Sequence, residues 1–270
     1  MHQRGNKMRI ANEYNHLNAR EFLIVNKEDQ YAEILNCITS VDANLYMKIS
    51  CDKTKLGKIF YSQGEINNAI KERLISHNWD EKRIDYYVTG DETTTRDILL
   101  EFDRAAQKRI IEERGFQAFR THNQVDFQKD RIAVEVQFGK YFSVAYDLHV
   151  KHTFFYTRND IDVGVEVIPT KAMEEHMDTG VPWFENEVTN VIRGGRTNPP
   201  IPILVIGIEP ENIQSCEPSD YSEYEMLEIL RRSDLIKLRT QIQRMQNTGN
   251  INDATANRIA TIDRCLAMIN

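Results

Sequence analysis

A nearly uninterrupted apolar run at residues 201–208 constrains the fold of this chain more than any other feature. It reads Ile-Pro-Ile-Leu-Val-Ile-Gly-Ile, which is too short to span a membrane and too continuous for a strand with one face in water. Such a run is typical of a strand covered on both faces, as in sheets with helices on either side. Helices are therefore expected before and after it.

The middle of the chain supplies the other strands of that sheet. Residues 116–127 have the pattern of extended chain, 131–138 alternate between apolar and polar residues, and 163–168 form another short apolar run. Helical spacing of apolar residues predicts helices over 141–156 and 182–192, the second with a proline in its first turn. Alternating strands and helices predict an α/β fold with a mixed central sheet flanked by helices.

Helices are expected to dominate both ends of the chain. The N-terminal candidates show amphipathic spacing, a capping-box pattern at Ser62 and a glycine stop at Gly115. They cover 19–38, 63–77 and 95–114. Toward the C-terminus two amphipathic segments meet near Gly249 and predict a helical hairpin. We therefore expect one domain over 1–215 with a helical N-terminal part, and a helical C-terminal extension over 216–270 packed on it.

The composition argues against several classes of protein. With 270 residues and 41% hydrophobic side chains the chain can bury a large core, and no stretch is apolar enough for a membrane span or a signal peptide. The formal charge of -7 argues against a protein that coats nucleic acid by bulk charge, but it allows an enzyme with a local basic face. The cysteines stand far apart, which argues against a zinc module or a disulfide framework and favours a reducing, cytoplasmic location. They are Cys37, Cys51, Cys216 and Cys265.

One segment places polar side chains in a strand that should be buried. In the strand predicted over 131–138, Glu135 and Gln137 share one face, because side chains alternate along a strand. Asp126 precedes them across a predicted tight reversal, so a hairpin would bring its carboxylate beside Glu135. Two converging carboxylates are the ligands that a hard Mg²⁺ ion prefers. A charged strand edge facing solvent would give the same alternation, so the spacing alone leaves both interpretations open.

The wider segment resembles a known group of enzymes. Residues 125–141 read Val-Asp-Phe-Gln-Lys-Asp-Arg-Ile-Ala-Val-Glu-Val-Gln-Phe-Gly-Lys-Tyr and resemble the catalytic segment of the BglII and BstYI group of type II restriction endonucleases. This group is the glutamine-containing variant of the PD-(D/E)xK nucleases. The resemblance extends over roughly 44–208, with an insertion between about 80 and 115. It implies a restriction-endonuclease-like core over this part of the chain.

The resemblance also implies roles for individual residues. Asp126 matches the family's first metal-binding aspartate, Glu135 matches its second metal-binding acid, and Gln137 stands where most PD-(D/E)xK enzymes have lysine. A glutamine amide is no base at neutral pH, but it can orient an attacking water. A further residue from the preceding helix often completes such sites. Glu113, in the last turn before Gly115, is the candidate here, and a solvated helix end explains it equally well.

Two loops are candidates for contact with DNA. Lys140 follows the strand of Glu135, and Asp178 and Thr179 form a polar loop where related enzymes carry base-contacting residues. An aspartate that accepts from cytosine and a lysine that donates to guanine would read a G·C pair. The Gly139-Lys140 pair is closer to BstYI than to BglII. The resemblance implies a palindrome centred on GATC as the recognition site.

Two histidines also invite a metal hypothesis. His149 and His152 are spaced to share one helical face, but the sequence offers no third ligand within motif reach. Surface or packing roles are therefore expected for both.

The expected activity is that of a type II restriction endonuclease. The resemblance implies Mg²⁺-dependent hydrolysis of double-stranded DNA by a homodimer, with a DNA methyltransferase as the partner that protects the same site. One alternative is a DNA-repair or nonspecific nuclease of the same superfamily, which would give a smear rather than discrete fragments from a plasmid. Another is a DNA-binding protein with a degenerate carboxylate pair. The helices after residue 221 form either a hairpin packed on the core or a dimer or DNA-clasping arm.

Overall fold

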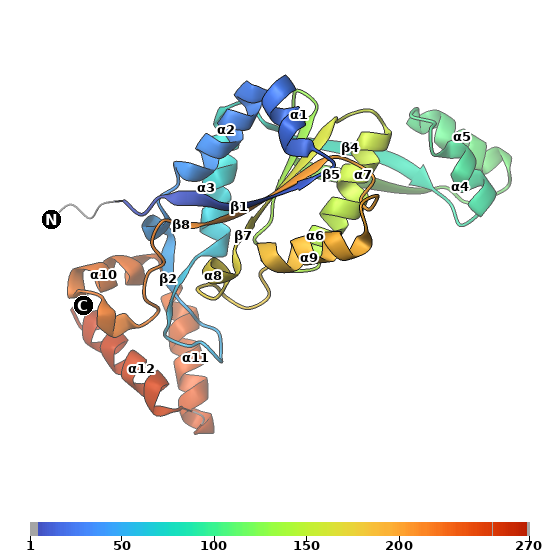
Figure 1. Ribbon diagram of the computed structural model, residues 1–270. Coiled ribbons are helices and arrows are strands. Elements are labelled where there is room, and N and C mark those ends of the chain that lie inside the picture. Colours follow the sequence, from blue (N-terminus) through green and yellow to red (C-terminus); the bar gives the residue numbers. More distant parts are fainter. Residues whose placement is uncertain (1–4, 250, 269–270) are drawn as a thin grey trace.

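A six-stranded mixed sheet lies at the centre of the computed structural model, which describes residues 5–249 and 251–268 (Figure 1). The strand order is β1-β8-β7-β6-β5-β4. The central strands β6 (Ile132–Val136), β7 (Val163–Pro169) and β8 (Ile203–Pro210) are parallel neighbours. Antiparallel strands flank them: β1 (Met8–His16) pairs with β8, while β5 (Phe119–Lys129) pairs with both β6 and β4 (Asp80–Val88). The predicted α/β fold with a mixed sheet is confirmed.

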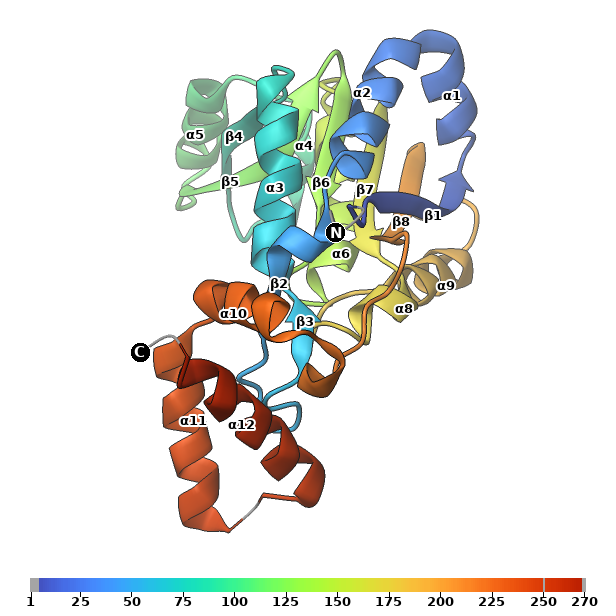
Figure 2. The ribbon, with the colours of Figure 1, turned by 90° about the vertical axis from the view of Figure 1, so that its left-hand side faces the viewer.

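Helices cover both faces of the sheet, which explains why every residue of β6 and β7 is buried. On one face lie α1 (Ala19–Asn26), α2 (Glu28–Thr39) and α3 (Gln63–Ser76), packed against Val134, Val136 and Phe138 among others. The other face carries α6 (Ser143–Tyr146), a π-helical turn over Asp147–Lys151, α7 (His152–Thr157) and α9 (Phe184–Gly194) (Figures 1 and 2). The predicted helices over 141–156 and 182–192 therefore exist, with small shifts at their ends.

Two helices that the periodicity predicts as continuous are broken. The helix expected over 19–38 is interrupted at Lys27, whose backbone leaves the helical region, so α1 and α2 are separate. The helix expected over 95–114 divides into α4 (Glu92–Ile98) and α5 (Arg104–Glu113), because the Asp103 carboxylate accepts from two backbone N–H groups and starts a new helix. Gly115, with φ +80°, ends α5 in the left-handed conformation as expected.

Two predictions about how helices begin were wrong. The Ser62 side chain makes no capping hydrogen bond, so the capping-box pattern before α3 is not used. Pro182 precedes α9 instead of lying in its first turn, since the helix begins only at Phe184.

The predicted insertion forms a separate projection. β4 and β5 extend from the sheet as a two-stranded ribbon, and α4 and α5 lie at its far end (Figure 1). The sequence pattern missed β4 and β1 as strands, because both edge strands carry many polar residues and are only partly buried. Short elements complete this part of the chain: β2 (Met47–Ile49), β3 (Ile59–Tyr61) and α8 (Lys171–Glu174).

The C-terminal part holds three helices where the sequence predicted a hairpin of two. They are α10 (Glu223–Arg232), α11 (Leu235–Thr248) and α12 (Asp253–Leu266). The chain breaks between α10 and α11 because the Asp234 side chain accepts from the backbone N–H of Lys237 and begins a new helix. Their apolar side chains join the same core as the sheet and the β2–β3 hairpin. Figure 2 shows α10 beside this hairpin. Among the described residues, no helix has both the length and the apolar character that crossing a membrane requires.

Candidate active site

A tight hairpin brings the two predicted carboxylates together. β5 and β6 are joined by Asp130 and Arg131, which both have positive φ and form a two-residue turn. Where β5 pairs with β4, a bulge lies between the pairs Lys82–Val125 and Asp80–Gln128. β5 has one residue more than β4 in this interval, and Asp126 is one of the bulged residues. A bulge re-aims a side chain, and one carboxylate oxygen of Asp126 lies 3.5 Å from the backbone nitrogen of Val136, next to Glu135.

Glu135 is a buried acid. Its side chain is 1% exposed. Burial, followed by the negative charges of Asp147 and Asp126, raises the pKa of Glu135 to about 8, although Lys151 acts in the opposite direction. A cation close to such a buried carboxyl group would stabilise its charged form. The predicted position of Glu135, on the polar face of a buried strand, is where the structure places it.

Lys151 supplies a positive charge to this cluster and was not predicted as a site residue. Its Nζ lies 3.1 Å from Glu135 Oε1 and 2.7 Å from Asp147 Oδ1. Burial lowers the pKa of Lys151, but the two carboxylates together outweigh burial and raise that pKa above its usual value. Asp147 and Lys151 lie at the two ends of the π-helical turn, a feature common at functional sites. Their spacing of four residues on the helix after β6 was the signal available in the sequence.

Gln137 is fixed at both ends of its amide. Its Nε2 donates to Asp147 Oδ2 at 3.1 Å, and its Oε1 accepts from the backbone N–H of Gly139 at 2.9 Å. A Cβ on residue 139 would lie 2.6 Å from that oxygen, so only glycine allows this contact. One N–H and one oxygen lone pair of the amide remain for a water or a phosphate.

A second lysine, also missed, balances Asp126. Lys71 on α3 places its Nζ 2.8 Å from Asp126 Oδ2, and both side chains are about a quarter exposed. The same ammonium lies 6.0 Å from the centre of the Phe127 ring. Each of the two predicted metal ligands therefore has a lysine as its neighbour.

Behind Glu135 lies a fully buried pair of side chains, Glu166 and His152. Glu166 on β7 stands opposite Glu135 in the parallel register. His152 Nε2 lies 3.5 Å from Glu166 Oε2, too far for a strong hydrogen bond. Burial raises the pKa of Glu166 well above its usual value and lowers the pKa of His152 to about 3, so burial favours the uncharged form of each side chain. His152 therefore packs against the sheet, as expected from its isolated position in the sequence.

The structure does not bring Glu113 to this cluster. Glu113 ends α5, is 68% exposed and faces Arg109 at 3.9 Å. Since α5 packs on α4 and β4 at the end of the projecting ribbon, its last turn is directed to solvent. The sequence placed α5 before the strand of Asp126, but α3 is the helix that reaches Asp126, through Lys71. The interpretation of Glu113 as a site residue was therefore wrong, and the solvated helix end is what the structure shows.

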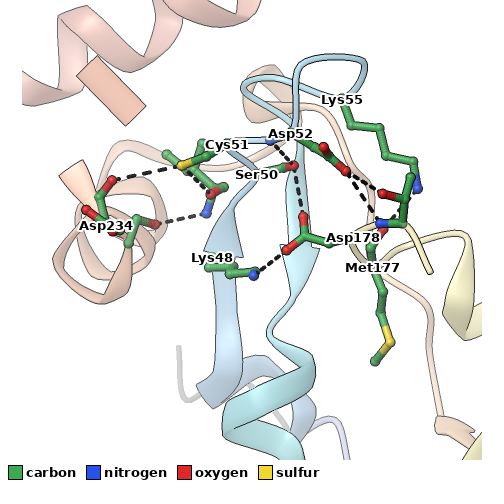
Figure 3. Close-up of polar contacts among 11 residues, drawn as sticks. Lys48, Ser50, Cys51, Asp52, Lys55, Met177, Asp178 and Asp234 are labelled. Atoms are coloured by element: carbon green, nitrogen blue, oxygen red, sulfur yellow. Dashed lines mark hydrogen bonds and ion pairs between the residues drawn. The ribbon is translucent and has the colours of Figure 1, made fainter. Parts of the chain in front are cut away.

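The predicted DNA-contacting loop is anchored to the β2–β3 hairpin (Figure 3). Asp178 accepts from Lys48 Nζ at 2.5 Å and from Ser50 Oγ at 3.1 Å. Thr179 Oγ1 donates to Asp52 at 3.0 Å. The carboxylate of Asp178 is thus already paired with the ammonium group of Lys48, a contact that the sequence did not reveal.

Lys140 lies close to this loop. The backbone N–H of Tyr141 donates to the carbonyl oxygen of Gly180 at 2.9 Å, so the two candidate DNA-contacting segments adjoin each other. Lys140 itself is exposed, with its Nζ 5.8 Å from the centre of the Phe142 ring. The side chain is therefore accessible to a large partner.

The acidic cluster fits a hard cation, although it holds no ready-made ligand cage. Within the described part of the chain, no three His, Cys, Asp or Glu side chains are grouped as a metal site. Asp126 and Glu135 nevertheless offer oxygen ligands, and burial together with the neighbouring carboxylates raises the pKa of Glu135, which a nearby cation would lower. A divalent cation would satisfy both carboxylates.

A mixed sheet that places two carboxylates and a glutamine around one buried strand is the arrangement that the resemblance to PD-(D/E)xK nucleases implies. A family model described as restriction endonuclease BglII/BglIII matches residues 11–208, and the chain therefore belongs to this family of type II restriction endonucleases. It is accordingly a site-specific deoxyribonuclease. The helices α10, α11 and α12 lie outside the matched residues.

Solved structures of BglII are similar in outline. The crystal structure of restriction endonuclease BglII complexed with a DNA 16-mer is 18% identical, with a TM-score of 0.48 over 74% of this chain and 75% of that chain. The crystal structure of free BglII is 16% identical, with a TM-score of 0.46 over 77% and 82% of the two chains. No curated protein matches the chain.

Proposed function

We propose that this restriction endonuclease is a Mg²⁺-dependent homodimer that cuts both strands of a short palindrome centred on GATC. The observation that carries the proposal is the cluster of Asp126, Glu135 and Gln137 around the end of β6, in a chain of this family. The proposal includes a cytoplasmic location and a cognate methyltransferase as partner. Digestion of a plasmid with Mg²⁺, followed by sequencing of the fragment ends, tests it directly, because a smear or uncut DNA would contradict it.

Each residue of the cluster has a distinct proposed task. Asp126 and Glu135 hold the cation, which when bound supplies stabilisation of phosphate charge and lowers the pKa of an adjacent water. Gln137 orients the attacking water, because Asp147 and Gly139 fix its amide from both ends. Lys71 and Lys151 balance the acidic charges before the cation binds.

Gln137→Ala is expected to slow single-turnover cleavage by about a hundredfold without shifting its pH profile, because an orienting amide carries no titrating proton. Gln137→Glu would instead add a carboxylate to the cluster and change the preferred metal. Both are measured as single-turnover rates across pH and with different divalent cations. Undiminished turnover in Gln137→Ala would remove Gln137 from the catalytic set.

Asp178→Ala and Lys140→Ala are each expected to weaken binding to the cognate site by about 1–3 kcal/mol while hardly changing nonspecific affinity. Equilibrium titrations with cognate and scrambled duplexes in Ca²⁺ measure this. Lys48→Met is the matched control, because it removes the partner of Asp178 and leaves its carboxylate in place. An equal loss on every sequence would make Lys140 a phosphate contact and Asp178 a bystander, and an equal effect of Lys48→Met would show that Asp178 acts through Lys48.

Supercoiled plasmid is expected to become linear with little nicked intermediate, because one chain carries one acidic cluster and a duplex break requires two clusters related by the duplex two-fold. Light scattering should give about twice the 31.5 kDa subunit mass, more clearly with cognate DNA. A monomer on DNA with accumulating nicked circles would identify a nuclease that cuts one strand at a time.

A further inference from the structure

Helix α11 has a basic and amide-rich surface without acidic residues. Its sequence is Leu-Ile-Lys-Leu-Arg-Thr-Gln-Ile-Gln-Arg-Met-Gln-Asn-Thr, in a chain whose formal charge is -7. Its apolar residues Leu238, Ile242 and Met245 are buried in the core. The polar side chains therefore lie on the outer surface, and the local charge of this helix is opposite to that of the whole chain.

Two of its cations form one stripe. Lys237, Gln241 and Arg244 follow each other at intervals of four and three residues, which puts them on the same side of a helix. Over 5–249 and 251–268, neither Lys237 nor Arg244 takes part in an ion pair. By contrast, Arg231 on α10 pairs with Glu228. Neither cation of the stripe is therefore held in a salt bridge by a side chain within these ranges.

The stripe begins beside the candidate DNA-contacting loop. Lys237 lines the same pocket, of about 530 Å³, as Lys48, Asp178 and Thr179. The junction before α11 is fixed to β2, because Ser233 Oγ accepts from the backbone N–H of Ile49 at 2.9 Å. Figure 3 shows the α11 end of this pocket at Asp234, across the β2 strand from Asp178.

We propose that the Lys237–Arg244 stripe of α11 binds backbone phosphates of the DNA that flanks the recognition site. The helix has 14 residues and is therefore about 21 Å long at 1.5 Å per residue. Successive phosphates of one strand rise about 3.4 Å along the duplex axis, so a helix of this length lying parallel to that axis spans about six base pairs. Charge complementarity and continuity with the loop of Asp178 favour duplex DNA over an acidic protein. The inference rests on the proposed function, because it takes that loop to face the DNA.

The test compares duplexes with short and long flanks around the same recognition site. Wild-type protein in Ca²⁺ is expected to bind a duplex with flanks of about 20 base pairs about tenfold more tightly than one with flanks of about 3 base pairs. The Lys237→Ala/Arg244→Ala variant should lose this advantage. The plot of log K against log salt has a negative slope, and its magnitude should decrease by about 0.9 for each phosphate that the variant no longer neutralises. The cleavage position and the ratio of cognate to nonspecific affinity should not change.

Arg231→Ala/Arg264→Ala is the matched control. It removes two positive charges from the same helical unit, from α10 and α12, and is expected to keep the flank advantage. Loss of that advantage in the control would show that net charge, rather than the α11 stripe, is responsible, and would overturn the proposal. Thermal melting of both variants verifies that they fold, and the single variants Lys237→Gln and Arg244→Gln replace the double variant if it does not.

Other outcomes are equally decisive. Equal wild-type affinity for both flank lengths would overturn the proposal. An α11 variant that keeps the flank advantage but changes the mass of the assembly in light scattering would also overturn the proposal, since α11 would then be a protein interface. Failure of the long-flanked duplex to be cleaved with any divalent cation would contradict the proposed function instead, while the binding measurements would still decide the role of α11.

Discussion

Replacing Glu135 or Asp126 with alanine is expected to abolish DNA cleavage while specific binding in Ca²⁺ remains measurable. Each side chain is proposed to hold the cation, and neither carboxylate is needed to complete the hydrophobic core of the sheet. Removing one ligand should lower the affinity for the cation and leave phosphate charge unbalanced during hydrolysis. Single-turnover cleavage and equilibrium binding of the cognate duplex measure the two effects separately.

Glu113→Ala is the matched control for both variants. It removes an acid from an exposed helix end, so the cleavage rate should stay at the wild-type value. The proposed roles of Glu135 and Asp126 would be refuted if either variant kept cleavage within about tenfold of wild type, which is roughly 1.4 kcal/mol of barrier.

Lys151→Ala is expected to lower the free energy of unfolding of the metal-free protein by about 3–5 kcal/mol at pH 8, because it leaves buried acids without their cation. Lys151 is the shared partner of Glu135 and Asp147. The loss should be smaller near pH 5, because Glu135, whose pKa is about 8 in the folded protein against 4.5 ordinarily, then carries a proton and needs no cation. Urea unfolding at the two pH values measures the difference, and added divalent cation should restore part of the stability.

Lys108→Ala provides the comparison for Lys151→Ala. Lys108 and Glu112 form an exposed pair on α5, so breaking it should change the free energy of unfolding by less than about 0.5 kcal/mol at either pH. A loss in Lys151→Ala that is as small as this, or that is the same at pH 5 and pH 8, would show that Lys151 does not balance the buried acids.

The strands β5, β6, β7 and β8 and the first two acids were predictable from the sequence because the signals are local. An apolar run at 201–208 is long enough to mark a buried strand, and alternation over 131–138 fixes the face on which Glu135 lies. The predicted reversal between them brought Asp126 beside Glu135, and the resemblance then supplied their expected roles as metal ligands. The division of the chain between 1–215 and 216–270 stays a prediction.

The rest of the cluster depends on contacts between segments far apart in the sequence. Lys71 reaches Asp126 from α3, and no periodicity links two residues separated by a whole insertion. The same insertion misled the interpretation of Glu113, because proximity in sequence placed it next to the strand of Asp126 while the ribbon carries α5 away. Similarly, the ion pair of Lys48 with Asp178 joins loops whose sequences contain no reciprocal motif.

The two-residue turn at Asp130 and Arg131 determines where this chain can change in length. β6 is held on its other side by its parallel pairing with β7, so an inserted residue in the turn would slide β5 by one position. Such a slip turns every side chain of a strand to the opposite face, and Asp126 would then point away from Glu135. The α4–α5 end of the ribbon packs mainly on itself and β4, and Arg158 at the end of α7 stacks on Phe102 there at 4.4 Å. Insertions and deletions among relatives are therefore expected there, and the distance in sequence from Asp126 to Glu135 should be constant.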